Sequence, residues 1–378
     1  MKSSSNFFAS RPDNELVPLR ELSARLGNNP LLVQASNGNT SIKIDGTLWI
    51  KASGKWLANA LREEMFMPIP LADVAGLLQK NNDIASRYSQ LLPYSLGQTL
   101  RPSVETAMHS VISHRAVVHV HSINAIALAI RADGMARISE RLAGLRWQWV
   151  PYAASGIPLA REIEKAIQAA PETNVFILAN HGLVVCGPDC QAAEDLLDEV
   201  ERRLTITPRQ SPKPNQTLLA ILAHFSGWQF PEVEALHALG TDAASRKIVK
   251  GGVLYPCQAI FLGQRMPVLS PALVASKFAD LWSGKISAPA FVIVERVGVL
   301  LNPNSTAAER ATLAALAHVT QRTEESAPVR YLSSADVSEV LAKNVYGYKK
   351  PITNRREVSS PAMINPPDRG GSWLQLRP

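Results

Sequence analysis

Two histidines flank a single residue at the end of a strand-like apolar run, and this pattern constrains the fold more than any other feature of the chain. His119-Val120-His121 follows the apolar residues 116–118, and His181 lies in a turn between two further apolar runs. Side chains at positions i and i+2 of a strand point to the same face, so His119 and His121 would present two imidazoles together. Three neutral imidazoles suit zinc and leave one coordination position open for water or substrate. The pattern therefore indicates a catalytic metal site.

A carboxylate precedes this strand in the segment Pro102-Ser103-Val104-Glu105. The spacing predicts a helix over residues 103–114, with Ser103 as its cap and Glu105 in its first turn. At that place a carboxylate can be a surface charge that favours the helix dipole. Beside a metal it would be a general acid or base. The residues alone leave both interpretations open.

Two short turns further upstream could bind an anion. A hairpin is predicted from residues 42–44 and 47–50 around Asp45-Gly46, with Gly38-Asn39 before it and Ser53-Gly54 after it. Such turns can offer backbone N–H groups, an amide and hydroxyls to an anion. The same residues are also ordinary turn formers.

Taken together, these segments resemble the class II, zinc-dependent aldolase and adducin family. The resemblance covers roughly residues 15–205, and two of its segments look most like the rhamnulose-phosphate aldolase branch. Its motifs, in family order, are Gly38-Asn39-Thr40-Ser41, Lys51-Ala52-Ser53-Gly54, Pro102-Ser103-Val104-Glu105 with His109, His119-Val120-His121 and Asn180-His181-Gly182.

The resemblance implies a role for each group of residues. His119, His121 and His181 would hold Zn²⁺, or another divalent metal, and Glu105 would move a proton. The activity implied is reversible cleavage of a carbon–carbon bond in a small ketose or ketose phosphate, through an enediolate that zinc stabilises. The residues that align with the family's phosphate cradle are Gly38, Asn39, Ser53, Gly54 and Ser103.

Two departures from the family pattern keep other reactions open. Many members carry a second serine directly before the glutamate, whereas this chain has Val104, which removes a hydroxyl donor. The family also often borrows a tyrosine from a neighbouring subunit, and Tyr152 is expected to pack in a wall instead. The alternatives are a decarboxylase or a ketose-phosphate epimerase on the same metal site, or a non-catalytic adducin-like binding module. The intact histidines and Glu105 argue against the last of these.

Length and local patterns predict two domains and a tail. A chain of 378 residues is long enough for two cores. We expect a class II aldolase-like catalytic domain over residues 1–208, a layered α/β/α domain with a central, largely antiparallel sheet. The predicted helices are 13–26, 83–92, 103–114, 123–130, 158–169 and 191–204, and the predicted strands besides the hairpin are 116–120, 175–178 and 183–186. The acidic side chains of residues 194–201 are interpreted as a solvated face.

A linker over residues 205–215 leads to a smaller α/β domain, residues 209–350. Its predicted helices are 217–225, 232–239, 305–320 and 333–342, and its predicted strands are 259–262, 291–295 and 297–301. No catalytic constellation is found there, and a regulatory, substrate-gating or oligomerising role stays open. The proline-rich tail, residues 351–378, could lie over a neighbouring subunit with Trp373 as its anchor.

Composition excludes several classes of protein. The net charge of +7 is scattered along the chain and not clustered, so we expect no nucleic-acid partner. No apolar run approaches the roughly 20 residues of a membrane span. Cys186, Cys190 and Cys257 are too few for a disulfide framework and predict free thiols in a reducing cytoplasm. The family resemblance also implies a homo-oligomer with active sites near subunit interfaces. It further implies that the substrate is a small sugar or sugar phosphate.

Overall fold

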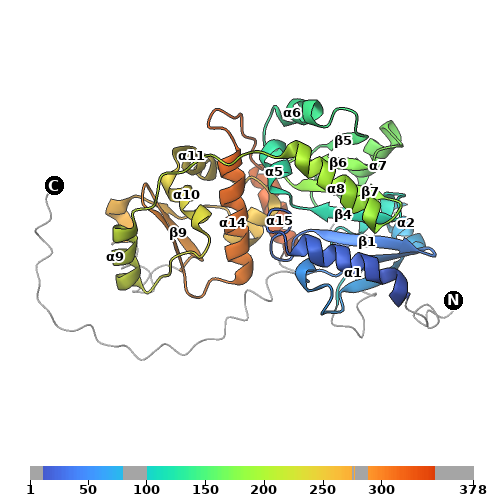
Figure 1. The fold of residues 1–378 in the computed structure, drawn as a ribbon, viewed down its shortest axis with the longest axis horizontal. Coiled ribbons are helices and arrows are strands. Elements are labelled where there is room, and N and C mark those ends of the chain that lie inside the picture. The colour runs from blue at the N-terminus through green and yellow to red at the C-terminus, as the bar shows by residue number, and fades with distance from the viewer. Residues whose placement is uncertain (1–11, 80–99, 275, 277–287, 345–378) are drawn as a thin grey trace, which may run out of the picture.

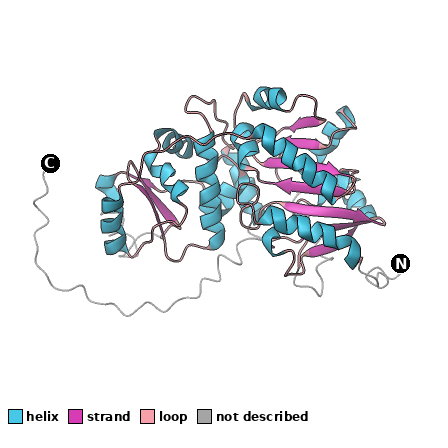
Figure 2. Ribbon diagram, in the orientation of Figure 1, coloured by secondary structure: helices cyan, strands magenta, loops and turns pink. Residues whose placement is uncertain are grey.

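A computed structural model describes residues 12–79, 100–274, 276 and 288–344, which form two sheets and their covering helices (Figures 1 and 2). The predicted helix at 83–92 and the tail at 351–378 lie outside the described residues. The first part consists of α1 (Asp13–Gly27), β1 (Asn39–Ile44), β2 (Thr47–Lys51), η2 (Leu57–Asn59), β3 (Phe66–Pro70), α2 (Leu71–Gln79), α4 (Thr106–Val111), β4 (Ala116–Val120), α5 (Ile123–Ala129), α6 (Gly134–Arg141), β5 (Trp147–Val150), α7 (Ile157–Ala169), β6 (Val175–Leu178), β7 (Gly182–Gly187) and α8 (Cys190–Leu204).

The seven described strands of this part form one sheet in the order β3-β2-β1-β4-β7-β6-β5. Every neighbouring pair is antiparallel except β5 and β6, which are parallel. The predicted hairpin around Asp45-Gly46 is confirmed, because Ile44 of β1 faces Thr47 of β2. The predicted α/β class with a largely antiparallel central sheet is therefore correct.

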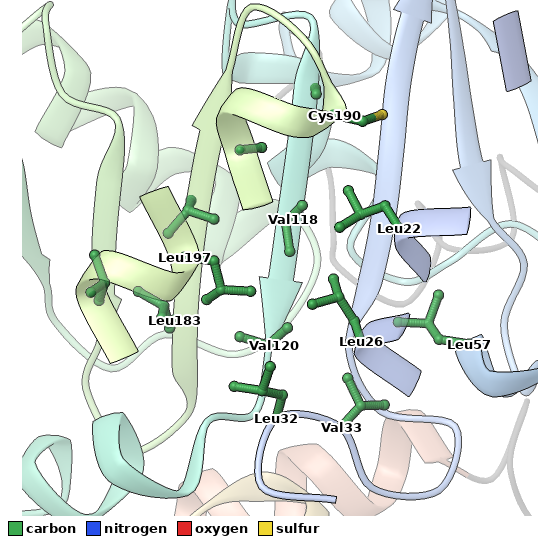
Figure 3. Packing of buried hydrophobic residues seen from close by; sticks show 14 of the residues in the cluster. Leu22, Leu26, Leu32, Val33, Leu57, Val118, Val120, Leu183, Cys190 and Leu197 are labelled. Carbon is green, nitrogen blue, oxygen red and sulfur yellow. The ribbon is translucent and has the colours of Figure 1, made fainter. Parts of the chain in front are cut away.

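Helices cover both faces of the sheet, because side chains alternate along each strand. Val118 and Val120 of β4 pack against α1 and α8, where Leu22, Leu26 and Leu197 close the layer (Figure 3). Val117 of β4 points the other way and packs with Met108 of α4 and Leu159 of α7, in one cluster with Phe176 and Val184. The result is a three-layer α/β/α arrangement. Since His119 alternates with Val118, it belongs to the face that α4 covers.

The second part carries a smaller sheet of three described strands in the order β10-β9-β8. Figure 1 shows α14 next to α5, at the junction of the two parts. The elements of this part are α9 (Gln216–Ser226), η4 (Glu234–His237), α10 (Ala238–Thr241), α11 (Ala243–Gly251), α12 (Pro256–Leu262), β8 (Val268–Leu269), β9 (Phe291–Val294), β10 (Gly298–Leu301), α14 (Ala307–Arg322) and α15 (Ser334–Asn344).

The two parts share buried hydrophobic surface. Ile123, Ile126 and Ile130, on or directly after α5, belong to one cluster with Leu254 and Leu316 of the second part. Backbone hydrogen bonds add to this contact, since Arg330 N–H donates to the Ile130 carbonyl. A domain boundary near residue 208 stays a prediction, but the parts are packed together over α5.

Three local predictions were wrong in detail. Residues 259–262 lie in the helix α12 and not in a strand, because Pro256 occupies its first turn and Gly263 ends it with φ +88. A four-residue apolar run does not distinguish a strand from a buried helix. The predicted helix 103–114 is shorter, because α4 covers only Thr106–Val111. The residue at its N-cap position is Glu105 and not Ser103, and the Glu105 side chain makes no capping hydrogen bond.

The acidic face predicted on α8 is only partly solvated. Glu194 pairs with Arg25 of α1, and Glu201 turns inward to accept a hydrogen bond from Asn124. Burial raises the pKa of Glu201. Because α8 packs over α5, one edge of its acidic side faces protein and not water.

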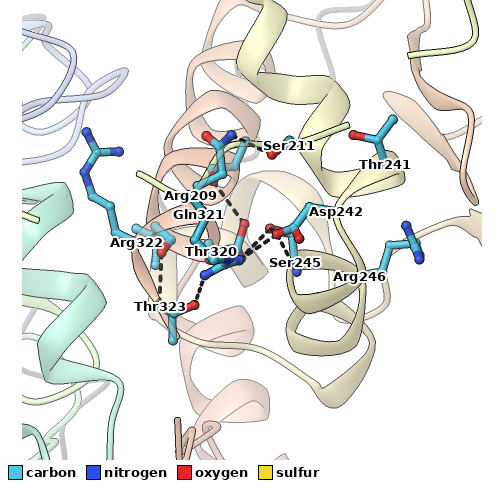
Figure 4. A network of polar contacts seen from close by, with 12 residues as sticks. Arg209, Ser211, Thr241, Asp242, Ser245, Arg246, Thr320, Gln321, Arg322 and Thr323 are labelled. Atoms are coloured by element: carbon cyan, nitrogen blue, oxygen red, sulfur yellow. Dashed lines mark hydrogen bonds and ion pairs between the residues drawn. The ribbon is translucent and has the colours of Figure 1, made fainter. Parts of the chain in front are cut away.

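The linker over residues 205–215 has no helix or strand, as predicted, yet it is firmly attached (Figure 4). Arg209 donates to the carbonyl of Thr320 at 2.9 Å, to the carbonyl of Thr323 and to the Asp242 carboxylate at 2.6 Å. These bonds connect the linker to α14 and to the start of α11. The linker therefore holds the second part in a defined position.

None of the described helices combines the length and the apolar character that a membrane crossing requires.

We expect Arg209→Ala to lower the free energy of unfolding by about 2–3 kcal/mol, because it removes the charged partner of two carbonyls and one carboxylate. Urea unfolding would measure the change. The matched control is Arg202→Ala, which removes an exposed ion pair with Glu199 and should change stability by less than about 1 kcal/mol. Equal effects of the two substitutions would contradict the structural role of Arg209.

Candidate metal centre

The three predicted histidines converge at one point. The ligand nitrogens of His119, His121 and His181 all lie within 4.8 Å of one another, and all three residues are buried. The ring centroids are 5.0, 5.0 and 5.1 Å apart, and the Nε2 atoms of His119 and His121 are 3.2 Å apart. Zinc–imidazole bonds of about 2.0–2.1 Å in a tetrahedral site require nitrogens roughly 3.3 Å apart. The donor set therefore fits one divalent cation.

Pairing of β4 with β7 brings the histidines together. Val120 of β4 faces Leu183 of β7, so the turn that carries His181 lies beside the end of β4. A Cβ at Gly182 would come within 2.6 Å of the Val120 carbonyl oxygen, so only glycine allows this approach. Asn180 turns the chain with φ +53, a left-handed conformation that asparagine tolerates. The motif Asn180-His181-Gly182 thus positions the imidazole of His181.

The second ring nitrogen of His119 fixes its tautomer. Its Nδ1–H donates to the Leu183 carbonyl at 3.0 Å, and a carbonyl can only accept. The lone pair of Nε2 is therefore left for the cluster. Metal-binding histidines commonly hold their other nitrogen in this way.

Glu105 lies against two of the three imidazoles. Its carboxylate oxygens are 3.5 Å from His119 Nε2 and 3.3 Å from His181 Nε2. Asn39 Nδ2 donates to it at 2.7 Å, and Ser155 Oγ donates at 3.2 Å. Burial raises the pKa of Glu105, but the neighbouring imidazoles and the Asn39 amide outweigh burial and hold the pKa well below its ordinary value. The side chain is therefore a carboxylate at neutral pH.

Burial keeps two of the imidazoles, those of His119 and His121, neutral. It lowers the pKa of His119 to about 4, although the nearby Glu105 opposes the shift, and it lowers the pKa of His121 in the same direction. Neutral imidazole is the form that binds metal. These histidines are therefore available as ligands at pH 7.

The five residues predicted to bind phosphate fall into two groups. Gly38, Asn39 and Ser103 are buried, and the last two contact Glu105, whereas Ser53 is half-buried and Gly54 is exposed. The Asn39 amide is already used, since its nitrogen donates to Glu105 and its oxygen bonds to His109. The Ser103 hydroxyl accepts from the Glu105 backbone N–H. Binding of an anion by these five residues stays a prediction.

A buried lysine connects the two turns. Lys51 Nζ donates to the Ser36 carbonyl at 2.8 Å and to the Lys55 carbonyl at 2.7 Å, so it ties residues 36–38 to residues 52–55. Burial lowers the pKa of Lys51 to about 7, while the Glu105 carboxylate opposes this shift. The sequence placed Lys51 within a family motif but did not indicate that its side chain connects the two turns.

Tyr152 packs against apolar side chains of the second part, in agreement with the predicted packing role. It contacts a cluster formed by Val253 and Ala259 on one side and Val337 and Val340 on the other. Its hydroxyl is buried without a hydrogen-bond partner among the described residues. Burial raises the pKa of Tyr152.

Sequence reasoning missed two contacts of the site, those of Ser155 and Cys257. Ser155 lies in a small-residue turn before α7, which is a weak signal by itself. Cys257 of α12 lies 3.5 Å from His121 Nδ1. No sequence pattern indicates this contact, because the two residues are far apart in the chain and the second part shows no recognisable motif.

We expect the metal-free protein to lose stability as the pH falls from 7 to 5.5. The folded-state pKa of buried His119 and His121 lies below the unfolded value of 6.5, so the unfolded chain binds more protons in this window. Urea unfolding at both pH values would measure the loss. His121→Gln should make the loss smaller, while His224→Gln, which removes an exposed histidine, should leave it unchanged. Stability that is flat across this window would refute the burial of neutral imidazoles.

Comparison with known proteins places this arrangement in a family. Residues 19–207, half of the chain, match the model of the class II aldolase and adducin N-terminal domain. The uncharacterized oxidoreductase YuxG of Bacillus subtilis (strain 168) is 27% identical over 173 residues, which are 43% of this chain and 25% of that protein. The chain thus spans only about a quarter of the length of this curated relative.

Two solved structures match this chain at low identity and with low TM-scores. The N-terminal class II aldolase domain of a conserved protein from Thermoplasma acidophilum is 21% identical, with a TM-score of 0.44, over 52% of this chain and 94% of that one. L-fuculose-1-phosphate aldolase from Thermus thermophilus is 19% identical, with a TM-score of 0.36, over 58% of this chain and all of that one (100%). The match of the family model over half of the sequence is what decides the assignment: the chain belongs to the class II aldolase and adducin family.

Proposed function

We propose that this protein is a metal-dependent aldolase that reversibly cleaves a carbon–carbon bond of a small ketose or ketose phosphate. The observation that carries the proposal is the cluster of His119, His121 and His181 with the Glu105 carboxylate 3.3 and 3.5 Å from two of the imidazoles. The rhamnulose-phosphate branch is our preferred subgroup, because two segments resemble it most, Lys51-Ala52-Ser53-Gly54 and Arg101-Pro102-Ser103-Val104-Glu105-Thr106. Zn²⁺ is the preferred metal, because three imidazoles suit it.

The three histidines would hold the cation and orient it toward the substrate. A divalent cation bound there would polarise the carbonyl of a ketose and stabilise the negative charge that develops as the bond breaks, by several kcal/mol. All other steps fall to side chains of the protein. In the condensation direction Glu105 would take a proton from the carbon next to the carbonyl, and in cleavage it would return one.

The neighbours of Glu105 prepare it for this role. Asn39 and Ser155 donate to its two oxygens, so the carboxylate is held in one orientation. His109 in turn bonds to Asn39 and to Ser41, which fixes the amide. A proton acceptor must be positioned before it can act efficiently, and this chain of hydrogen bonds positions it.

The substrate's anionic end is assigned to the turn at Ser53-Gly54. This turn is accessible, unlike Gly38, Asn39 and Ser103, and Lys51 holds it against the residue 36–38 turn. Val104 supplies no hydroxyl there. We therefore propose that a phosphate, where the substrate has one, makes its contacts chiefly with Ser53 and the backbone of Gly54.

The cellular setting is also proposed. The three cysteines are free and buried, which supports a reducing cytoplasm. We propose a homo-oligomer with active sites near subunit interfaces, and light scattering of the purified protein would test it.

We expect His121→Ala and Glu105→Gln to fail in different ways. His121→Ala should lose bound metal and activity together, whereas Glu105→Gln should keep about one metal per chain and lose about 10²–10⁴ in rate. Metal analysis and cleavage assays on a panel of ketoses and ketose 1-phosphates would measure both. The control is His224→Ala, on the exposed side of α9.

Normal metal content and turnover in both variants would end the proposal. The products separate related reactions on the same site, because an aldolase gives two carbon fragments, a decarboxylase gives CO₂ and an epimerase gives an isomer. A protein without bound metal or turnover would favour an adducin-like binding module.

We expect Ser53→Ala to discriminate between phosphorylated and free sugars. It should raise KM for a ketose 1-phosphate about tenfold, since a hydrogen bond to a charged group contributes roughly 1.5–3 kcal/mol. The value of kcat/KM for the unphosphorylated sugar should not change. Ser110→Ala is the matched control, because that hydroxyl donates to the Ala107 carbonyl of α4. An equal effect on both sugars would show that Ser53 does not bind the phosphate.

A further inference from the structure

A side chain from the second part of the chain reaches the metal centre. Cys257, in the first turn of α12, lies 3.5 Å from His121 Nδ1 and 3.0 Å from Asn37 Oδ1. Cys257 is 6% exposed, so the thiol is enclosed by protein. Asn37 precedes Gly38, and the sulfur therefore bridges a candidate metal ligand and a turn beside the site.

The chemistry of the groups decides which way these hydrogen bonds run. An amide oxygen can only accept, so the thiol S–H donates to Asn37 Oδ1. The sulfur then accepts from the Nδ1–H of His121. This leaves the Nε2 lone pair of His121 for the cluster, where it lies 3.2 Å from His119 Nε2. Cys257 thus does for His121 what the Leu183 carbonyl does for His119.

The same segment also holds the turn before the third ligand. Asn180 Nδ2 donates to the carbonyls of Leu254 and Arg330, both at 2.8 Å. Asn180 directly precedes His181, and Leu254 lies three residues before Cys257. The second part therefore contacts the surroundings of two ligands by two independent routes.

We propose that Cys257 is a positioning residue of the metal centre, and that the segment 254–257 sets the orientation of His121 and His181. This rests on the proposed role of the three histidines as metal ligands. The second part is then an integral component of the centre and not only an appended module. Outer-shell partners of metal-binding histidines fix the ring and its tautomer, and their removal commonly weakens metal binding 10- to 100-fold.

The alternative is that Cys257 only fills space in the core, and the chain contains a matched control for this. Cys186 is also buried, and its sulfur lies 3.3 Å from the Nδ1 of a different imidazole, that of His114, which does not belong to the cluster. Cys186→Ala removes the same atoms from a similar environment away from the metal centre. A space-filling role predicts equal effects of Cys257→Ala and Cys186→Ala on every property of the protein.

The experiment measures metal affinity directly, without any substrate. Full-length protein is stripped of metal and titrated with Zn²⁺ against a competing chelator, and the absorption spectrum of bound Co²⁺ reports ligand geometry. We expect Cys257→Ala to weaken Zn²⁺ binding 10- to 100-fold and to change the Co²⁺ spectrum, and Cys186→Ala to leave both unchanged. Cys257→Ser, which keeps a donor and an acceptor, should restore most of the affinity.

A second variant addresses the other route. Asn180→Gly deletes the two hydrogen bonds to the second part, while glycine still adopts the left-handed backbone at this position. It should weaken Zn²⁺ binding as well. Circular dichroism of each metal-free variant shows whether it folds, and if Cys257→Ala does not fold, Asn180→Gly decides alone.

The outcomes separate this inference from the proposed function. If wild-type protein binds one Zn²⁺ tightly and both Cys257→Ala and Asn180→Gly bind it equally well, the inference is overturned and the proposed function stands. If the wild-type protein binds no divalent metal, the proposed function itself fails.

Discussion

The close antiparallel pairing of β4 with β7 is the constraint on which the rest of the structure depends. It brings the end of one strand and the turn before another to a common point, and Gly182 permits that approach because any Cβ there would strike the Val120 carbonyl. The same pairing provides the Leu183 carbonyl that orients His119. One backbone contact thus sets the positions of three imidazoles and the tautomer of one of them.

The centre is a region of buried polar groups that stabilises the fold poorly by itself. The three imidazoles, a buried carboxylate and the buried amino group of Lys51 all lose contact with water, and hydrogen bonds to protein groups must replace the lost hydration. Asn39, Ser155 and the carbonyls of Ser36 and Lys55 supply such groups. Binding of a cation would add stability that grows with the ratio of its concentration to its dissociation constant. These hydrogen bonds thus hold the groups around the three histidines in place.

The second part of the chain changes how the first is understood. Its core is continuous with α5, and Arg209 attaches the linker to α14 and Asp242, so the two parts have a defined relation. Through Cys257 and the partners of Asn180 it also contacts the surroundings of the three-histidine cluster. A role confined to oligomerisation would not require these contacts.

The sequence by itself determined the elements whose signals are local. The hairpin around Asp45-Gly46 and the strand β4 that carries His119 follow from turn residues and alternation, each set by residues within a few positions of one another. The choice of three histidines and Glu105 as chemically important also came from the sequence, through spacing and family motifs.

Only the tertiary structure decided which distant groups meet. Cys257 contacts His121 across 136 positions, and Glu201 faces Asn124 because α8 packs over α5. Residues 259–262 lie in the helix α12 and not in a strand, because Pro256 occupies its first turn and Gly263 ends it, while a short apolar run fits either conformation. Such contacts depend on how complete layers pack, and no short stretch of sequence contains that information.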